Sequence, residues 1–156
     1  KLQDPFGFLS RFSDKPMTGP KFLVPLVIKP NHQNMQFERG REWEVKPAAP
    51  FLTAKKVFIT DGRAISYTET MMGIVENYKL GEIVGAATAG TNGNINPFQL
   101  PGGYRIIYTG MKVQKHDGSQ HHGIGVLPNV NVKRTRAGVA AGRDEFLEKA
   151  LEVVKR

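Results

Sequence analysis

The spacing of apolar residues along the chain changes most clearly near its middle. Residues 55–60 form a short apolar run that is typical of a buried strand, and residues 81–85 form a second one. Between them, apolar side chains recur at helical spacing, at Tyr67, Met71, Ile74, Val75 and Tyr78. A strand, a helix and a strand in this order predict an α/β fold.

Further apolar runs predict strands outside this unit. Residues 22–28 favour a strand, and Pro25, which has no N–H to donate, favours an edge position for it. Residues 98–108 predict a hairpin with a Pro-Gly-Gly turn, continued by residues 111–113. Residues 123–132 predict a turn that leads into another strand.

The end of the chain predicts an amphipathic helix. Asp144 is a suitable N-cap residue for it. The apolar stripe of this helix is expected to be core and consists of Phe146, Leu147, Ala150, Leu151 and Val154.

The polar stretches predict loops. Residues 1–20 favour a helical turn or a loop, and residues 29–50 a polar excursion. Within the excursion, Trp43 is interpreted as a packing anchor in preference to a platform that stacks on a ligand. Residues 88–97 are rich in glycine and asparagine and predict several turns. This loop lacks the Gly-Lys-Ser/Thr ending of a P-loop, which argues against nucleotide binding.

Length and charge limit the classes of protein. A chain of 156 residues suits a single domain, so residues 1–156 are predicted to form one unit or part of one. Lys and Arg number 22 and Asp and Glu 14, and the net charge of +8 raises the hypothesis of a nucleic-acid binder. The basic residues are scattered apart from a cluster at 133–136, and no nucleic-acid-binding motif accompanies them. A solvated basic surface is therefore preferred, with no nucleic-acid partner.

Cysteine is absent, which excludes disulfides, thiolate metal ligands and a thiol nucleophile in this chain. No apolar run approaches the roughly 20 residues of a membrane-spanning helix. The chain starts at Lys1, without an initiator Met or the apolar segment of a signal peptide. We therefore expect a piece of a longer protein, and in this piece no transmembrane span, no cofactor and no metal.

Ser66 stands where the apolar strand turns into the helix, and two interpretations of it are open. Serine is a preferred N-cap residue, and Glu69 three positions later would complete a capping box. The position also suits a nucleophile, because the N–H groups and the positive dipole end of a helix N-terminus stabilise a developing negative charge. The residues alone favour the cap.

A serine nucleophile also needs a base, and histidine is the obvious one. The four histidines are His32, His116, His121 and His122. The adjacent pair makes a poor metal site, because neighbouring strand residues face opposite sides and no third ligand has suitable spacing. We expect this pair to be exposed to solvent. Asp61 and Glu69 could orient a histidine, but the sequence does not assemble a complete triad.

Several motifs, in order, resemble the serine peptidase family of the C-terminal processing peptidases and tricorn protease. Residues 65–69 are similar to the family's Ser-Ala-Ser-Glu-like segment, and residues 83–90 to its Val-Gly-x-x-Thr-x-Gly strand and loop. Residues 118–129 are similar to its Gly-hydroxy-basic turn and Gly-Val-x-Pro-Asp segment, and residues 143–151 to its closing helix. The resemblance implies a crotonase-like or ClpP-like α/β fold of stacked strand-helix units, here incomplete. It also implies that Ser66 is the nucleophile.

Two departures from the family bear on the mechanism. The processing-peptidase branch has a lysine base 25 residues after the serine, where this chain has Thr91. The resemblance is therefore to the tricorn-like branch, whose base is a histidine from well upstream. In tricorn-type enzymes a carboxylate precedes the Gly-Val-x-Pro-Asp segment, but here His122 takes that place and Asn129 replaces the Asp. The role of this region stays open.

The family's oxyanion hole pairs the backbone N–H after the serine, here that of Tyr67, with a glycine from an upstream strand end. That glycine motif does not precede Ser66, so the chain is expected to begin inside the catalytic domain. The isolated chain is then expected to be inactive, with its general base outside these residues.

The resemblance implies a serine peptidase that hydrolyses peptide bonds of peptide or protein substrates through an acyl-enzyme at Ser66. The alternative is a catalytically incomplete peptidase-like module that binds extended peptides or protein C-termini. A location in the bacterial periplasm, in the cell envelope or outside the cell is implied by the resemblance only. Assembly into a homo-oligomer stays open.

Overall fold

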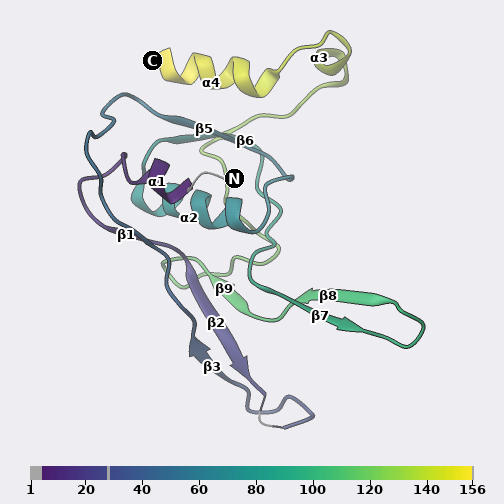
Figure 1. The fold of residues 1–156 in the computed structure, drawn as a ribbon. Coiled ribbons are helices and arrows are strands. Elements are labelled where there is room, and N and C mark those ends of the chain that lie inside the picture. Colours follow the sequence, from purple (N-terminus) through teal and green to yellow (C-terminus); the bar gives the residue numbers. More distant parts are fainter. Residues whose placement is uncertain (1–4, 28, 156) are drawn as a thin grey trace.

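The computed structural model describes residues 5–27 and 29–155 and shows the mixed α/β fold predicted from the sequence (Figure 1). Its helices are α1 (Pro5–Leu9), α2 (Tyr67–Tyr78), α3 (Arg136–Ala140) and α4 (Glu145–Lys155). Its strands are β1 (Met17–Thr18), β2 (Lys21–Leu26), β3 (Gln36–Arg39), β4 (Glu44–Val45), β5 (Val57–Thr60), β6 (Glu82–Gly85), β7 (Ile95–Gln99), β8 (Arg105–Thr109), β9 (Lys112–Gln114) and β10 (Val130–Asn131). None of the helices in these two ranges is both long and apolar enough to cross a membrane.

A parallel sheet in the order β10-β6-β5 lies at the centre of the fold. Strands β5 and β6 are the two strands predicted around the central helix, and they pair in parallel from Val57 opposite Glu82 to Thr60 opposite Gly85. Helix α2 connects them and covers one face of the sheet, while α4 covers the other (Figure 1). The predicted strand-helix-strand unit is confirmed.

The core follows the alternation of side chains along β6. Ile83 faces α2 and packs with Ile74, whereas Val84 faces α4 and packs with Ala150 and Val153. The cluster on the α2 side also contains Leu9, Met17, Val45, Met72, Val75, Leu80 and Val126. The N-terminal segment and the region before β10 therefore share a core with the central unit.

Only part of the predicted apolar stripe of α4 is core. Phe146 and Ala150 are buried, whereas Leu147, Leu151 and Val154 are 46%, 48% and 36% exposed. The prediction is wrong for these three residues because α4 rests on two short strands, β5 and β6. So narrow a surface covers only one side of the stripe.

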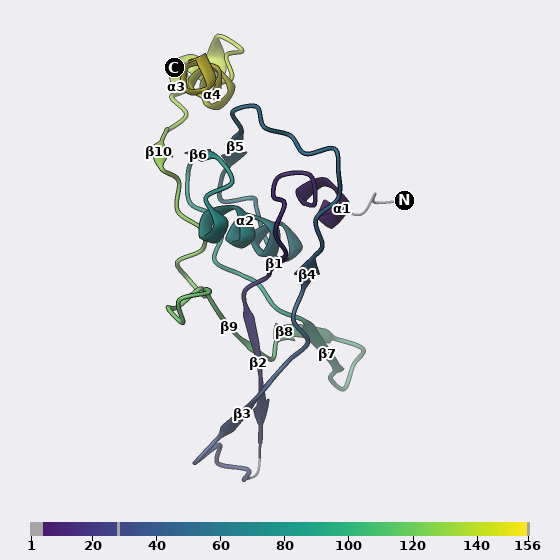
Figure 2. The ribbon, with the colours of Figure 1, turned by 90° about the vertical axis from the view of Figure 1, so that its left-hand side faces the viewer.

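Strand β2 lies in the middle of a second sheet, in the order β3-β2-β9, so the predicted edge position is wrong. Pro25 is tolerated because β9 pairs only with residues Lys21, Phe22 and Leu23. At Pro25 the strand therefore pairs with β3 alone among the described residues. This sheet extends away from the central one (Figure 2).

The polar excursion supplies β3 and β4 and then returns to the body of the molecule. Strand β3 pairs with β2, and β4 pairs with β1. The ring of Trp43, just before β4, packs edge-on against Tyr67 with 5.7 Å between the ring centroids. Trp43 thus packs on the body as predicted, although 42% of it stays exposed.

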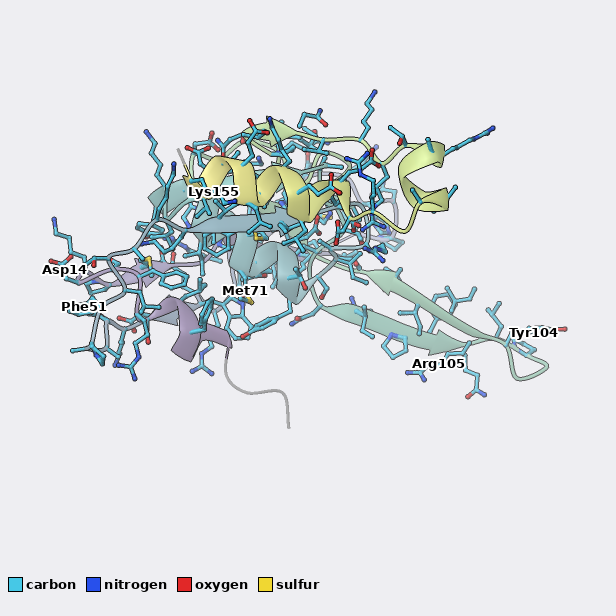
Figure 3. The ribbon with its side chains drawn as sticks, turned by 90° about the horizontal axis from the view of Figure 1, so that it is seen from above. Asp14, Phe51, Met71, Tyr104, Arg105 and Lys155 are labelled. Atoms are coloured by element: carbon cyan, nitrogen blue, oxygen red, sulfur yellow. The ribbon has the colours of Figure 1, made fainter. Side chains whose placement is uncertain are left out.

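The predicted hairpin is present as β7 and β8 and projects from the body, with Tyr104 and Arg105 toward its far end (Figure 3). Every residue of the two strands except Thr109 is exposed. The predicted continuation through residues 111–113 is wrong, because the chain bends at Met111 and enters β9, which pairs with β2. The hairpin therefore forms a two-stranded sheet of its own.

Candidate active site

Ser66 occupies a strained turn between β5 and α2. Its φ is 52° and its ψ is −120°, a combination that residues other than glycine rarely adopt. Its N–H donates to the Thr91 carbonyl oxygen at 2.7 Å, and its own carbonyl oxygen accepts from the N–H groups of Glu69 and Thr70. The residue as a whole is exposed. The turn therefore presents a serine side chain at the start of a helix while fixing its backbone.

The predicted capping box is wrong. The Ser66 side chain makes no capping hydrogen bond, and the Ser66 N–H is bonded to Thr91 instead of to Glu69. The carboxylate of Glu69 points into the interior, where the residue is fully buried. The backbone twist at Ser66 explains the difference, because an N-cap residue takes an extended conformation with negative φ.

Glu69 is the centre of a buried polar cluster. Its Oε1 accepts from the Thr88 hydroxyl at 2.5 Å and from the Gly90 N–H at 2.6 Å. Its Oε2 faces Nε2 of His121 at 3.2 Å, outside the alignment of a good hydrogen bond. Burial by itself raises the pKa of Glu69, but the approach of His121 and the hydrogen bonds from Thr88 and Gly90 outweigh it, so the pKa lies below 4.5. Glu69 is therefore held as a carboxylate.

The two adjacent histidines have separate surroundings, and the predicted solvent-exposed pair is wrong. His121 is 2% exposed and lies against Glu69. His122 is half-buried, and its Nε2 accepts from the N–H of Val113 in β9 at 2.9 Å. Neighbouring residues point to different sides, as expected, but both sides are occupied by protein. No cluster of metal-ligating side chains occurs in the two described ranges.

Asp61 and Glu69 are the two carboxylates that could orient a histidine, and the structure places Glu69 beside His121. Asp61 is committed to Arg63, whose guanidinium and backbone N–H bond it, and these hydrogen bonds lower the pKa of Asp61. His116 contacts the Thr18 carbonyl oxygen at 2.7 Å and packs against Tyr78, at the opposite end of α2 from Ser66. The sequence offered Glu69 as an orienting group but gave no means of choosing His121.

Two residues that depart from the family pattern have structural contacts. Thr91, at the position of the lysine base, holds the Ser66 N–H through its carbonyl oxygen. Asn129, in place of an Asp, accepts from the N–H of Ile83 through Oδ1 at 2.9 Å. Both residues therefore help to fix the backbone around the central sheet and the Ser66 turn.

An apolar groove of about 690 Å³ lies between β2, β3 and the base of the β7–β8 hairpin. Its lining includes Val24, Phe37, Tyr108, Met111 and His122. Sequence patterns did not predict this groove, because its walls come from five separate strands and the loops between them.

Comparison with known proteins places the chain among the peptidases. The model of peptidase family S41 matches residues 18–132, which is more than half of the chain. The chain therefore belongs to peptidase family S41. The resemblance to C-terminal processing peptidases is thereby confirmed. A search of curated proteins finds no match.

Solved structures share the fold. A candidate peptidase from Parabacteroides merdae ATCC 43184 superposes with a TM-score of 0.78 at 19% identity, covering 96% of this chain and 46% of that one. Mature CPAF in complex with lactacystin gives a TM-score of 0.74 at 14% identity, covering 99% and 41%. The photosystem II D1 C-terminal processing protease gives 0.56 at 18% identity, covering 82% and 30%. At these identities the likeness concerns the fold, and the chain spans less than half the length of each of the three.

Proposed function

We propose that this chain is part of a serine peptidase catalytic domain that hydrolyses peptide bonds through an acyl-enzyme at Ser66. The backbone of Ser66 carries the proposal. An exposed serine at φ 52° and ψ −120° costs about 1–3 kcal/mol of strain, and such strain clusters at functional sites. A strained serine at a strand-to-helix turn is also the arrangement of the nucleophile in α/β-hydrolases.

The proposed reaction begins when the hydroxyl oxygen of Ser66 attacks the scissile carbonyl carbon and gives its proton to a general base. The carbonyl oxygen then carries the negative charge, and the N–H of Tyr67 in the first turn of α2 donates to it. When the C–N bond breaks, the leaving amine takes the proton from the base. Water then attacks the acyl-enzyme with help from the same base, which releases the peptide carboxylic acid and returns the proton to Ser66.

The general base is proposed to be a histidine in the part of the peptidase domain that this chain does not cover. His122 accepts a hydrogen bond from Val113, and His116 lies at the far end of α2. Thr91 offers no amine in place of a lysine. The isolated chain is accordingly expected to be inactive. The crotonase-like or ClpP-like detail of the fold and an exported location, implied by the family resemblance, belong to the same proposal.

The test compares the full-length protein with its Ser66→Ala variant, using a fluorophosphonate probe and a peptide library. We expect the substitution to abolish both labelling and cleavage, because no other side chain forms the acyl-enzyme. Thr68→Ala, which removes an exposed hydroxyl two residues away, serves as the control and should label normally. Labelling that survives in Ser66→Ala would exclude Ser66 as the nucleophile.

A second candidate is a peptidase-like module that binds extended peptides or protein C-termini without cleaving them. It is favoured by Thr91 at the lysine position and by His122, which stands in place of a carboxylate and is bonded to Val113. This candidate predicts that the full-length protein binds peptides from the library but neither cleaves them nor reacts with the probe. The same experiment therefore separates the two functions.

A further inference from the structure

The proposed mechanism uses Ser66 and Tyr67 but leaves unexplained a buried pair directly behind them. Glu69 is 0% exposed and His121 is 2% exposed, although both side chains are ionisable. Burying such groups is unfavourable unless they are paired and hydrogen-bonded. A pair of this kind one helical turn from a strained serine calls for a role beyond packing.

The pair is linked to Ser66 through the loop that precedes β7. Glu69 holds this loop at Thr88 and Gly90 through its Oε1. The next residue, Thr91, holds the N–H of Ser66 at 2.7 Å. Glu69 itself is on the first turn of α2, where a side chain points back toward the helix N-terminus. A displacement of this carboxylate would therefore move the acceptor that fixes the Ser66 backbone.

A second link joins the same loop to the segment that carries His121. The N–H of Gly123 donates to the Gly90 carbonyl oxygen at 2.9 Å, and that of Val126 donates to the Thr88 hydroxyl at 2.8 Å. The His121 carbonyl oxygen accepts from the N–H of Gly125 at 2.8 Å. The side chain of His121 then closes the ring by its approach to Glu69.

We infer that Glu69 and His121 are positioning residues that hold Ser66 in its reactive backbone conformation through the 88–91 loop. This inference rests on the proposed function of Ser66. A strained backbone persists only where its surroundings over-determine it, and the closed network of Glu69, His121, Thr88 and Gly90 supplies that constraint. Without it, Ser66 would relax toward an ordinary N-cap and its hydroxyl would leave the line of attack, while the rest of the fold stayed intact.

The experiment measures fluorophosphonate labelling in the full-length protein and separates the maximal labelling rate from the probe affinity. His121→Phe keeps an aromatic ring but removes the contact with Glu69, and His121→Gln restores an N–H donor. Glu76→Gln is the matched control, because Glu76 lies on the same helix and pairs with Lys115 at 2.8 Å, away from Ser66. Folding of each variant is checked by its thermal transition, and labelling is measured well below it.

We expect His121→Phe to lower the maximal labelling rate about 10- to 100-fold with probe affinity nearly unchanged, since a shift of about 1 Å in a reacting group can cost 10²-fold. His121→Gln should recover most of the rate, and Glu76→Gln should match the unaltered protein. A folded His121→Phe that labels at the normal rate would overturn the inference, as would a His121→Gln no better than His121→Phe.

If His121→Phe does not fold, Glu69→Gln carries the same expectation, because it keeps an acceptor for Thr88 and Gly90 while losing the charge that faces His121. A normal rate in folded Glu69→Gln would then overturn the inference. Failure of the proposed function gives a different result, namely labelling that persists in Ser66→Ala or an unaltered protein that does not react with the probe.

Discussion

The Ser66 turn and the β7–β8 hairpin are close along the chain but have opposite surroundings. Around Ser66 the backbone is held by a second segment, because the Ser66 N–H donates to Thr91 and the Ala64 carbonyl oxygen accepts from Ala89. Glu69 and His121 are buried behind this turn. Nine of the ten hairpin residues in strands are exposed, including Phe98, Ile107 and Tyr108. The connection between the regions is anchored by Asn92, which donates to the Thr70 hydroxyl at 3.0 Å.

The contrast shows that hydrogen bonds between distant segments are concentrated at the proposed nucleophile. The hairpin is held by its own cross-strand hydrogen bonds, and an isolated two-stranded hairpin is marginally stable in water. The Ser66 turn and Glu69 behind it are held by hydrogen bonds to residues 19 to 25 positions away in the sequence. Substitutions of the same kind should therefore have unequal effects in the two regions.

Glycine to alanine substitutions should show the largest difference. Gly90 has φ +71°, and a Cβ there would lie 2.8 Å from the backbone nitrogens of Gly123 and Ile124. Gly103, in the hairpin turn, has φ +84° but open space around it. We expect Gly90→Ala to lower the free energy of unfolding by about 3 kcal/mol or more, since the clash adds to a backbone cost of about 1–3 kcal/mol. Gly103→Ala should show the backbone cost alone.

The measurement is urea unfolding of both variants and the unaltered chain, with the m-values compared to check that the transition keeps its cooperativity. Equal losses at the two glycines would mean that the close approach of the 88–91 loop to the 121–126 segment is not maintained in solution.

The sequence was sufficient to predict local elements, because their periodicity is local. The strands at 55–60 and 81–85, the helix between them and the hairpin with its Pro-Gly-Gly turn all rest on patterns within a few residues. The errors concern contacts between distant segments. Pro25 lacks a backbone N–H, which from the sequence alone indicates an edge strand. The strand is central, and the missing N–H is tolerated because β9 is too short to reach Pro25.

In the candidate site, too, the local features were predicted and the contacts between distant segments were not. The placement of Ser66 at a helix start followed from the pattern, but its positive φ did not, because the strain is imposed by Thr91 from another segment. Glu69 was expected to cap its own helix and instead accepts hydrogen bonds from Thr88 and Gly90 and lies against His121. His121 looked like one of an exposed pair because nothing local shows that Glu69 lies opposite it.

Acid should act mainly on the buried cluster behind the Ser66 turn. The pKa of Glu69 is lowered in the folded chain relative to its ordinary value of 4.5, so Glu69 stabilises the fold above that pH. This contribution is lost as the pH falls below 4.5 and through the folded-state value, where the carboxylate takes up a proton. We expect Glu69→Gln to flatten the decline of unfolding free energy below pH 4.5, while lowering the value at pH 7.

Glu148 provides the control for this experiment. Hydrogen bonds from Arg143 lower the pKa of Glu148 as well, but the pair is exposed on the surface and screened by solvent. Urea unfolding at pH 7, 5, 4 and 3 would compare Glu69→Gln with Glu148→Gln. A decline in Glu148→Gln as flat as that in Glu69→Gln would show that the buried cluster has no special part in acid sensitivity.

The smallest effect is expected in the hairpin. Ile107 is 51% exposed, whereas Ile83 in β6 is 1% exposed. Threonine keeps the β-branched shape that strands favour, so Ile107→Thr should change the free energy of unfolding by no more than about 0.5 kcal/mol. Ile83→Thr should cost about 2 kcal/mol or more, because it removes buried apolar contacts and buries a hydroxyl. The measurement is urea unfolding of both variants. A loss for Ile107→Thr comparable with that for Ile83→Thr would mean that the hairpin packs against other protein surface in solution. The contrast between the two regions would then no longer hold.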